Sequence, residues 1–494
     1  AAQGLLAFTD TGLTLTLTMA DVLDRSGDGA GALRAYDRAK RAAEARGAAL
    51  PETARLGRAR LMSTVVGRQP EALEEFRDIR ATTRDPRIGA RNLEIWADMR
   101  RRQGRTGDVR TLRGWLVDEY PASSEAAEVM WEQGSAAESR GEATEALADY
   151  ARLAADAPEL ARAGQARMRM GQIHIGQGRL DEAAEVFEAY LTDFPRGRRW
   201  DEAAYWAART RLQLADTAAS RRFTDRLRRE EAVSYYAVMS ADLLGETYAV
   251  DLPEGEAPQE PEWLTDGLRR MDLLEEAGLT RGADALEGEL VRRSRGTRAV
   301  MLRLGEALNE RGRTVTGINL GWEIRRDGGP WDRRLLQVVY PFPYRELVVR
   351  EAREWGVDPL MFAALIRQES AFKADIRSGA GAVGLMQVMP PTGKELARAH
   401  GPDGFQEASL ESPEVNLHLG AAFFVAMDQR YDGDLPLVLS AYNAGPTRAT
   451  RWRRYPEASD PLRFTERIPF DETRGYVKNV RRNLGVYRIL YGQD

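Results

Sequence analysis

The chain has 494 residues, 43% of them hydrophobic, which is enough for about three domains that each bury their own core. Its formal net charge of −5 is small for this length and no long basic run is present, so we expect neither nucleic acid nor an anionic membrane surface as a partner. No apolar run approaches the ~20 residues that span a bilayer, and the sequence does not open with the basic start of a signal peptide, so we do not expect a membrane-spanning protein.

The sequence contains no cysteine, and its three histidines, His174, His400 and His418, lie in separate segments. This composition excludes a cysteine nucleophile and zinc sites of the usual cysteine and histidine kind. We therefore predict neither a metal site nor a cofactor.

The first half of the chain contains an internal repeat in which each copy begins at a glycine. The glycines are Gly27, Gly67, Gly104, Gly141 and Gly178, of which Gly104 begins a degenerate copy. In the other four copies a small residue follows five positions later and an aromatic residue nine positions later, namely Ala32 and Tyr36, Ala72 and Phe76, Ala146 and Tyr150, and Ala183 and Phe187. Each of the last three glycines is followed seventeen residues later by a proline, at Pro121, Pro158 and Pro195.

This pattern predicts one helical hairpin per copy, because glycine suits the tight turn, the small residue allows close helix approach and proline ends the second helix. Such hairpins stack into an α-solenoid. The pattern resembles tetratricopeptide (TPR) repeats with a longer period, and we predict a TPR-like solenoid over residues 1–250. Two functions fit it equally, a scaffold that only shapes the molecule and a surface that binds a protein partner.

The repeat ends near residue 250, where "DLPEGEAPQEPEW" (251–263) is rich in proline and glutamate and predicts a linker or an exposed loop. A second helical stretch follows, and "YPFPYRELV" (340–348) interrupts it with two prolines. We therefore predict a helical linker domain over 251–340 and a third domain over 341–494.

The segment "GVDPLMFAALIRQESAF" (356–372) predicts a helix whose N-terminus is capped by Asp358. Helical spacing places Glu369 on the same face as the apolar side chains of Phe362, Leu365 and Ile366. Burial and the negative end of the helix dipole both raise the pKa of such a carboxyl, as a general acid requires. The alternative, an ordinary surface glutamate at a helix end, is commoner in general but does not explain the apolar face.

Three further segments carry weaker signals. The glycine-rich "SGAGAVGLMQVMPPT" (378–392) allows a ligand to approach the backbone, with Met386 and Met389 for apolar contact and Gln387 for polar contact, although a plain turn is the alternative. "LPLVLSAYNAGP" (435–446) ends an apolar helix with Tyr442 and Asn443. "IPFDETRGYVKNVRRNLGVYRILY" (468–491) begins a last helix at Asp471, with Glu472 in its first turn. "SPEVNLHLGAAFFVAMDQRY" (412–431) predicts a buried helix with no role beyond packing.

In their order and separation, "QES", "SGAGAVGLMQ", "AYNAGP" and "IPFDETRGYVKNV" resemble the catalytic domain of the soluble lytic transglycosylases, over about 362–480. These bacterial enzymes cleave peptidoglycan on a lysozyme-like fold. The resemblance implies an all-α protein in which the α-superhelical TPR-like solenoid precedes a C-terminal lysozyme-like domain of the goose type. It also implies that the N-terminal helices form an arch or ring that guides glycan strands.

The resemblance further implies that Glu369 is the single catalytic acid and base, and that the hydroxyl of Tyr442 lies by its carboxylate. Glu472 resembles a cleft carboxylate of the exolytic subgroup. The candidate substrate-binding residues are Ser370, Ser378, Gly384, Met386, Gln387, Met389, Tyr442, Asn443 and Glu472.

The implied reaction cleaves the β-1,4 bond between N-acetylmuramic acid (MurNAc) and N-acetylglucosamine (GlcNAc) with the help of the 2-acetamido group, and leaves 1,6-anhydromuramic acid ends. The expected partners are peptidoglycan glycan strands, and this substrate implies the periplasm. Most glycosidases use two carboxylates, and here only Asp375 and Glu472 stand near Glu369 as second candidates. Two alternatives remain, a muramidase that hydrolyses the same bond and a non-catalytic protein that only binds glycan or a partner.

Overall fold

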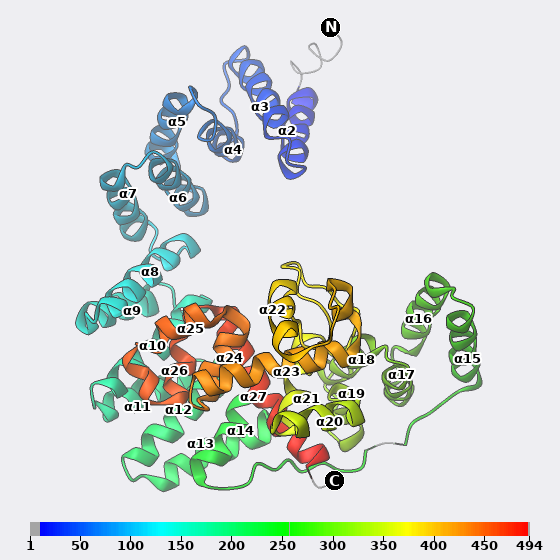
Figure 1. Cartoon of the computed structure of the whole chain (residues 1–494). Helices are drawn as coiled ribbons and strands as arrows, with labels where there is room; N and C mark the ends of the chain where they lie inside the picture. The colour runs from blue at the N-terminus through cyan, green and yellow to red at the C-terminus, as the bar shows by residue number, and fades with distance from the viewer. Residues whose placement is uncertain (1–9, 256, 493–494) are drawn as a thin grey trace. The chain divides into compact units, whose positions relative to one another are not determined.

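The structure, a computed structural model, describes residues 10–255 and 257–492 (Figure 1). These residues are helical almost throughout and contain no β-strand, only isolated bridges that join Arg377 to Val383 and Val383 to Val388. The predicted all-α fold is confirmed. The chain divides into two compact units, residues 1–215 and 216–494.

The N-terminal unit contains α2 (Asp10–Arg25), α3 (Gly29–Glu44), α4 (Glu52–Met62), α5 (Gln69–Thr82), α6 (Pro86–Arg102), α7 (Thr106–Glu119), α8 (Ser124–Arg140), α9 (Ala143–Asp156), α10 (Ala161–Gly176), α11 (Leu180–Asp193) and α12 (Trp200–Gln213). Consecutive helices pack against one another as antiparallel hairpins, and neighbouring hairpins are in contact along the chain. The predicted solenoid of helical hairpins is therefore confirmed.

The repeat glycines lie in the turns of these hairpins. Gly27, Gly67, Gly104, Gly141 and Gly178 all have a positive φ, between 71° and 90°, a conformation that residues with a Cβ rarely adopt. The repeat prolines follow the ends of α7, α9 and α11. The predicted turn and stop signals are confirmed.

The aromatic residues of the repeat fill the space between paired helices. Tyr150 and Phe187 are fully buried, and each lies against a glycine of the preceding helix. A Cβ added at Gly134 would lie 2.7 Å from the Tyr150 ring, and one at Gly171 would lie 2.2 Å from the Phe187 ring. The paired helices therefore approach closely at these glycines, with the aromatic ring occupying the place of a side chain.

The second unit contains α13 (Thr217–Glu230), α14 (Tyr235–Leu244), α15 (Glu262–Glu276), α16 (Thr280–Ser294), α17 (Arg298–Glu310), α18 (Thr314–Arg326), α19 (Arg333–Val339), α20 (Arg345–Trp355), α21 (Pro359–Glu369), α22 (Pro390–His400), α23 (Pro413–Arg430), α24 (Leu435–Ala444), α25 (Pro446–Trp452), α26 (Pro461–Arg467), α27 (Asp471–Tyr491) and the 3₁₀ helices η1 (Glu407–Glu411) and η2 (Pro456–Ser459). The long helix α27 packs against α14, α21, α24 and α26.

One hydrophobic core runs through the second unit, from Val233 between α13 and α14 to Leu490 in α27. Residues 251–255 and 257–261 have no regular secondary structure, as expected for the predicted linker or loop. Helix α14 also packs on α27, since a Cβ added at Gly485 would lie 2.8 Å from Val238. The division into three domains at 250 and 340 stays a prediction. The hydrophobic core of the second unit continues across residue 340.

Candidate active site

Glu369 is the last residue of α21, whose N-terminus is capped by the predicted residue. The carboxylate of Asp358 accepts a hydrogen bond from the backbone N–H of Leu360 at 2.9 Å. Phe362, Leu365 and Ile366 are fully buried, so the predicted apolar face is confirmed. The side chain of Glu369 lies partly buried beside it.

A constrained turn follows Glu369 immediately. Ala371 and Phe372 have φ values of +50° and +63°, a left-handed conformation that is costly for a bulky residue. The hydroxyl of Ser370 donates to Ile366 O at 3.2 Å and accepts from the Phe372 N–H at 3.1 Å. The hydroxyl of Thr314 in α18 donates to Ala371 O at 2.5 Å. These three bonds hold the turn, and with it the end of α21.

Tyr476 of α27 is the hydrogen-bond partner of Glu369. Its hydroxyl donates to Glu369 Oε1 at 2.5 Å, and the tyrosine is 5% exposed. Burial raises the pKa of Glu369 to about 7, although the hydrogen bond from Tyr476 acts in the opposite direction. Burial and the neighbouring carboxylate raise the pKa of Tyr476 well above its ordinary value, so the phenol remains a donor. The carboxyl can therefore gain or lose a proton near neutral pH.

The sequence-based interpretation assigned the hydroxyl near the carboxylate to Tyr442, and did not single out Tyr476. In the structure the Tyr442 hydroxyl donates to Met386 O at 2.8 Å instead. Through this bond Tyr442 contacts the glycine-rich loop, and burial, with the charge of Glu369 as a second cause, raises the pKa of Tyr442 well above its ordinary value. Tyr476 lies within the quoted motif "IPFDETRGYVKNV", four residues after Glu472.

Asn416 of α23, which the sequence-based interpretation also missed, organises the glycine-rich loop. Its side-chain oxygen accepts from the Met386 N–H at 2.8 Å, and its amide donates to Val383 O and Leu410 O, each at 2.8 Å. A buried asparagine in an otherwise apolar helix is the signal that could have revealed it. One side chain therefore fixes the position of the loop backbone through hydrogen bonds.

The predicted loop residues differ in how far their side chains are exposed to solvent. Gly384 and Met386 are buried, whereas Ser378 and Met389 are exposed and Gln387 is half-buried. The Gln387 amide donates to Gly384 O at 2.9 Å, and the Ser378 hydroxyl accepts from the Ala382 N–H at 2.9 Å. Side-chain contact with a ligand is thus open only to the exposed and half-buried residues of this loop.

The remaining predicted residues lie on α24 and α27. The side chain of Asn443 accepts a hydrogen bond from Thr473 at 2.7 Å, which joins the two helices. Glu472 is exposed in the first turn of α27, on the side of the helix that also carries Tyr476. Asp375 is 75% exposed and pairs loosely with Lys373 at 3.9 Å. The structure thus brings Glu369, Tyr442, Met386 and Tyr476 together and leaves Asp375 in solvent.

Residues 346–464 match the transglycosylase SLT domain. Residues 165–196, which contain the hairpin of α10 and α11, match a tetratricopeptide repeat. The resemblance of the sequence motifs to the soluble lytic transglycosylases is confirmed.

Two curated relatives are soluble lytic murein transglycosylases. The protein from Salmonella typhimurium is 30% identical over 298 residues, which cover 59% of this chain and 44% of the relative. The protein from Escherichia coli K12 is 30% identical over 302 residues, with the same shares of 59% and 44%. The matched part thus covers less than half the length of these relatives.

Two solved structures share the fold. One is an inactive glutamate-to-glutamine mutant of lytic transglycosylase Slt from Pseudomonas aeruginosa, with a TM-score of 0.66 and 22% identity over 96% of this chain and 81% of the other. The other is the 70 kDa soluble lytic transglycosylase of Escherichia coli, with a TM-score of 0.56 and 21% identity over 98% of this chain and 86% of the other. The fold class predicted from the sequence is confirmed.

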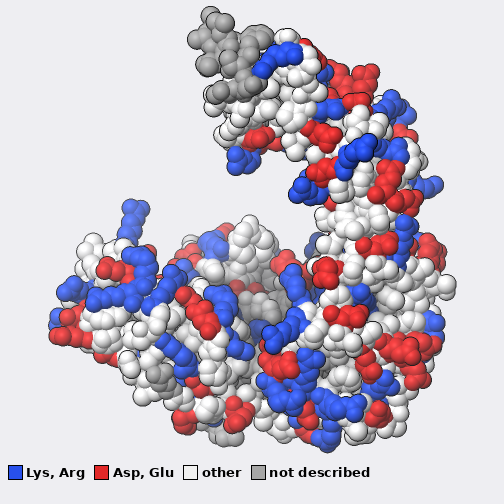
Figure 2. All heavy atoms as spheres, turned by 180° about the vertical axis from the view of Figure 1, so that it is seen from behind, with Lys and Arg blue, Asp and Glu red and all other residues white. Residues whose placement is uncertain are grey.

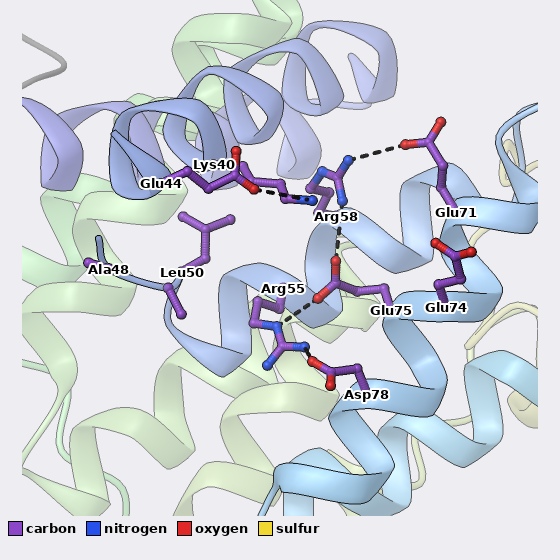
Figure 3. Close-up of a pocket in the computed structure, with 11 residues that line it drawn as sticks. Lys40, Glu44, Ala48, Leu50, Arg55, Arg58, Glu71, Glu74, Glu75 and Asp78 are labelled. Carbon is purple, nitrogen blue, oxygen red and sulfur yellow. Dashed lines mark hydrogen bonds and ion pairs between the residues drawn. The ribbon is translucent and has the colours of Figure 1, made fainter. Parts of the chain in front are cut away.

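A separate pocket of about 540 Å³ lies in the N-terminal unit, between α3, α4 and α5 (Figure 3). Arg58, 5% exposed, forms its wall and pairs with Asp37 at 2.8 Å, with Glu75 at 3.3 Å and with Glu71 at 3.4 Å. Arg55 pairs with Glu75 at 2.6 Å. These charges neutralise one another across the helices, so the pocket is lined by ion pairs.

Charges are also interspersed at the surface. Basic and acidic side chains alternate along the helices of the N-terminal unit on the face shown in Figure 2. Among the described helices, none combines the length and the apolar character needed to cross a membrane.

Proposed function

We propose that this chain is a peptidoglycan lytic transglycosylase that cleaves the β-1,4 bond between MurNAc and GlcNAc and leaves 1,6-anhydromuramic acid ends. The observation that carries the proposal is Glu369, a partly buried carboxyl with a pKa of about 7 at the end of the α21 helix of an SLT domain. A carboxyl with such a pKa can serve first as an acid and then as a base at one working pH.

In the first step Glu369 acts as the acid. Because Tyr476 donates to Oε1, the proton of the neutral carboxyl belongs on Oε2. This proton passes to the glycosidic oxygen as the bond to the anomeric carbon breaks, and GlcNAc leaves with a neutral hydroxyl. The substrate's own 2-acetamido oxygen then stabilises the sugar cation.

In the second step the glutamate, now a carboxylate, acts as the base. It removes the proton of the muramic acid 6-hydroxyl, whose oxygen attacks the anomeric carbon and displaces the acetamido oxygen. The 1,6-anhydro ring forms, Glu369 is protonated again and no water is consumed. The hydrogen bond from Tyr476 stabilises the carboxylate between the two steps.

The surroundings of Glu369 favour substrate assistance over a second protein carboxylate. Ordinary retaining and inverting glycosidases place two carboxyl groups roughly 5–10 Å apart across the bond. Of the two candidates that the sequence offers, Asp375 is 75% exposed and Glu472 is exposed in the first turn of α27, whereas the carboxylate of Glu369 is partly buried and hydrogen-bonded to Tyr476.

The predicted binding residues fall into two groups in this proposal. Ser378, Gln387, Met389, Tyr442, Asn443 and Glu472 present exposed or half-buried surface, and we assign them to contact with the glycan strand. Gly384, Met386 and Ser370 are buried, and they set the position of the loop backbone and of Glu369. The proposed substrate implies the periplasm, and we assign the N-terminal repeats to guiding a glycan strand or to binding a protein partner.

The test is mass spectrometry of purified peptidoglycan digested by the wild-type chain and by Glu369→Gln. Anhydromuropeptides are one water lighter than hydrolytic products, so the wild type should release anhydro ends and Glu369→Gln should release essentially none. Glu346→Gln, which removes an exposed carboxylate of α20, is the matched control and should remain active.

The two alternative functions give different results in the same experiment. Release of reducing, hydrated ends by the wild type would identify a muramidase. Equal and negligible release by both proteins, while both sediment with peptidoglycan, would identify a glycan-binding protein.

A further inference from the structure

A second cluster of ionisable side chains lies between α20 and α23. Glu351 and Glu354 stand one turn apart on α20, and His418 faces them from α23. One ligand atom of each residue lies within 4.8 Å of the others. Glu351 is 5% exposed, His418 is partly exposed and Glu354 is exposed, so the cluster begins in the core and opens to solvent.

The hydrogen bonds of His418 fix which ring nitrogen carries the proton. Its Nε2 lies 3.2 Å from His400 O, a carbonyl that can only accept, so Nε2 carries the hydrogen. Its Nδ1 lies 3.0 Å from Glu351 Oε2. When Nε2 carries the ring hydrogen, the Nδ1 lone pair faces the carboxylate oxygen, and both atoms are available as ligands to one metal ion.

Neighbouring groups hold the cluster but leave these two atoms facing each other. The ring of Trp355 packs against His400 and His418, with centroid distances of 5.1 and 5.4 Å. The guanidinium of Arg350 lies 3.4 Å from Glu351 Oε1, the other oxygen of that carboxylate.

We propose that Glu351, Glu354 and His418 form a site for a divalent transition-metal ion, with zinc as the best fit. Imidazole nitrogen together with carboxylate oxygen suits zinc, whereas calcium and magnesium prefer oxygen alone. Tetrahedral bonds of about 2.0 Å place ligand atoms roughly 3.3 Å apart, close to the 3.0 Å between Nδ1 and Oε2. The ligand atom of Glu354 lies within 4.8 Å of the other two, and its exposed side chain moves inward to complete the site. The Nε2–H that donates to His400 O is the outer hydrogen bond that zinc-binding histidines characteristically make.

The proposed metal site lies on a helix that packs against α21, the helix that ends at Glu369. Helix α20 packs against both α21 and α23, so a metal ion bound by all three residues clamps α20 to α23 behind the helix that ends at Glu369. The ion stabilises the SLT domain and takes no part in the proposed reaction. The exposed Glu354 and the open fourth position, filled by water, make the ion exchangeable.

The experiment is isothermal titration of ZnCl₂ into the full, untagged chain after chelator dialysis, at a pH where a free imidazole is neutral. The expected result is one zinc ion per chain and a higher melting temperature with zinc. Glu354→Gln should weaken binding by about 10–100-fold, and His418→Gln should abolish it. Glu346→Gln on the same helix and His400→Gln, which keeps the backbone carbonyl, should bind zinc as the wild type does.

Several outcomes overturn the proposal. They are the absence of wild-type binding, unchanged affinity in Glu354→Gln, or loss of binding in His400→Gln, which would place the zinc on the exposed ring of that residue. Absence of wild-type binding would leave the contact between His418 and Glu351 as a hydrogen bond that only holds α20 against α23. Near-UV circular dichroism checks that each variant is folded, and since Glu354 is exposed, its variant decides the matter even where His418→Gln unfolds.

Discussion

At the scale of single residues, burial raises the pKa of Glu369 and the hydrogen bond from Tyr476 lowers it. Tyr476→Phe removes the hydroxyl that donates to Glu369 Oε1, and because this bond favours the carboxylate, the pKa of Glu369 should rise above about 7. The alkaline limb of the kcat/KM profile, where the acid is lost, should move to higher pH. We expect kcat to fall by about tenfold, the effect of one hydrogen bond to a charged group.

Tyr442→Phe is the matched control, because its hydroxyl donates to Met386 O. It should leave the alkaline limb where it is in the wild type. Equal shifts in both variants would show that general repacking of the site, rather than the bond to Glu369, sets the pH profile.

The raised pKa of Glu369 also predicts how the stability of the fold depends on pH. Its pKa is about 7 in the folded chain and 4.5 ordinarily, so between these values the folded state holds more protons than the unfolded state. Stability is therefore lost as pH rises through this window. Glu369→Gln, which cannot ionise, should become more stable than the wild type by up to about 3 kcal/mol above pH ~7.

Denaturant unfolding of both proteins at a series of pH values checks this prediction. At a pH below the window the two stabilities should converge. A constant difference across the whole range would mean that Glu369 ionises no differently in the folded and unfolded chains.

The residue-scale contrast between Glu369 and Tyr476 shows what a sequence can reveal. Glu369 was predictable because its signals are local: a capped helix, an apolar face and a carboxyl at its end. Tyr476 is 107 residues away from Glu369 in the sequence. The packing of α27 against α21 decides which side chain of α27 contacts the carboxyl, and no local pattern shows that packing. The same holds for Asn416, whose partners Met386 and Val383 lie 30 and 33 residues away in the loop.

At the scale of helices, the hairpins of the solenoid were predictable because glycine and proline act locally. The residue against which each aromatic ring packs was not predictable, because Gly134 and Gly171 do not belong to the repeated motif. These glycines make the close approach possible, and a side chain there would collide with the ring.

Gly171→Ala tests this packing. The new Cβ would lie 2.2 Å from Phe187 Cζ, so the ring or the helix must shift, and we expect a loss of about 1–3 kcal/mol in the free energy of unfolding. Gly114→Ala in α7 is the control, because nothing lies within 4 Å of its added Cβ. The control should gain about 0.5–1 kcal/mol from helix propensity. Urea unfolding of each chain measures the two effects, and stabilisation by both substitutions would contradict the packing argument.

At the scale of the whole molecule, the packing of α14 bears on where the unit that contains the SLT domain begins. Tyr236 of α14 donates to Glu466 Oε1 at 2.8 Å, and Lys478 of α27 donates to Glu466 Oε2 and to the Tyr236 hydroxyl, each at 2.6 Å. Glu466 is 6% exposed. No local pattern in the sequence could indicate a contact that spans 230 residues, and the predicted boundary at 250 separates these partners.

Fragments of the chain test which boundary describes an independent folding unit. A fragment of residues 216–494 keeps the Tyr236, Glu466 and Lys478 cluster and the core from Leu264 onward, so it should unfold cooperatively and retain activity on peptidoglycan. A fragment of residues 341–494 keeps the SLT match but leaves Glu466 and Lys478 without Tyr236, and it exposes the core faces that α17 and α19 cover. The lost hydrogen bond from Tyr236 to the charged Glu466 is worth about 1.5–3 kcal/mol, and together with the exposed core faces its loss should make this fragment melt at a lower temperature or aggregate. Thermal unfolding followed by circular dichroism compares the two, and equal melting temperatures would show that the predicted boundary at 340 delimits the folding unit of the catalytic domain.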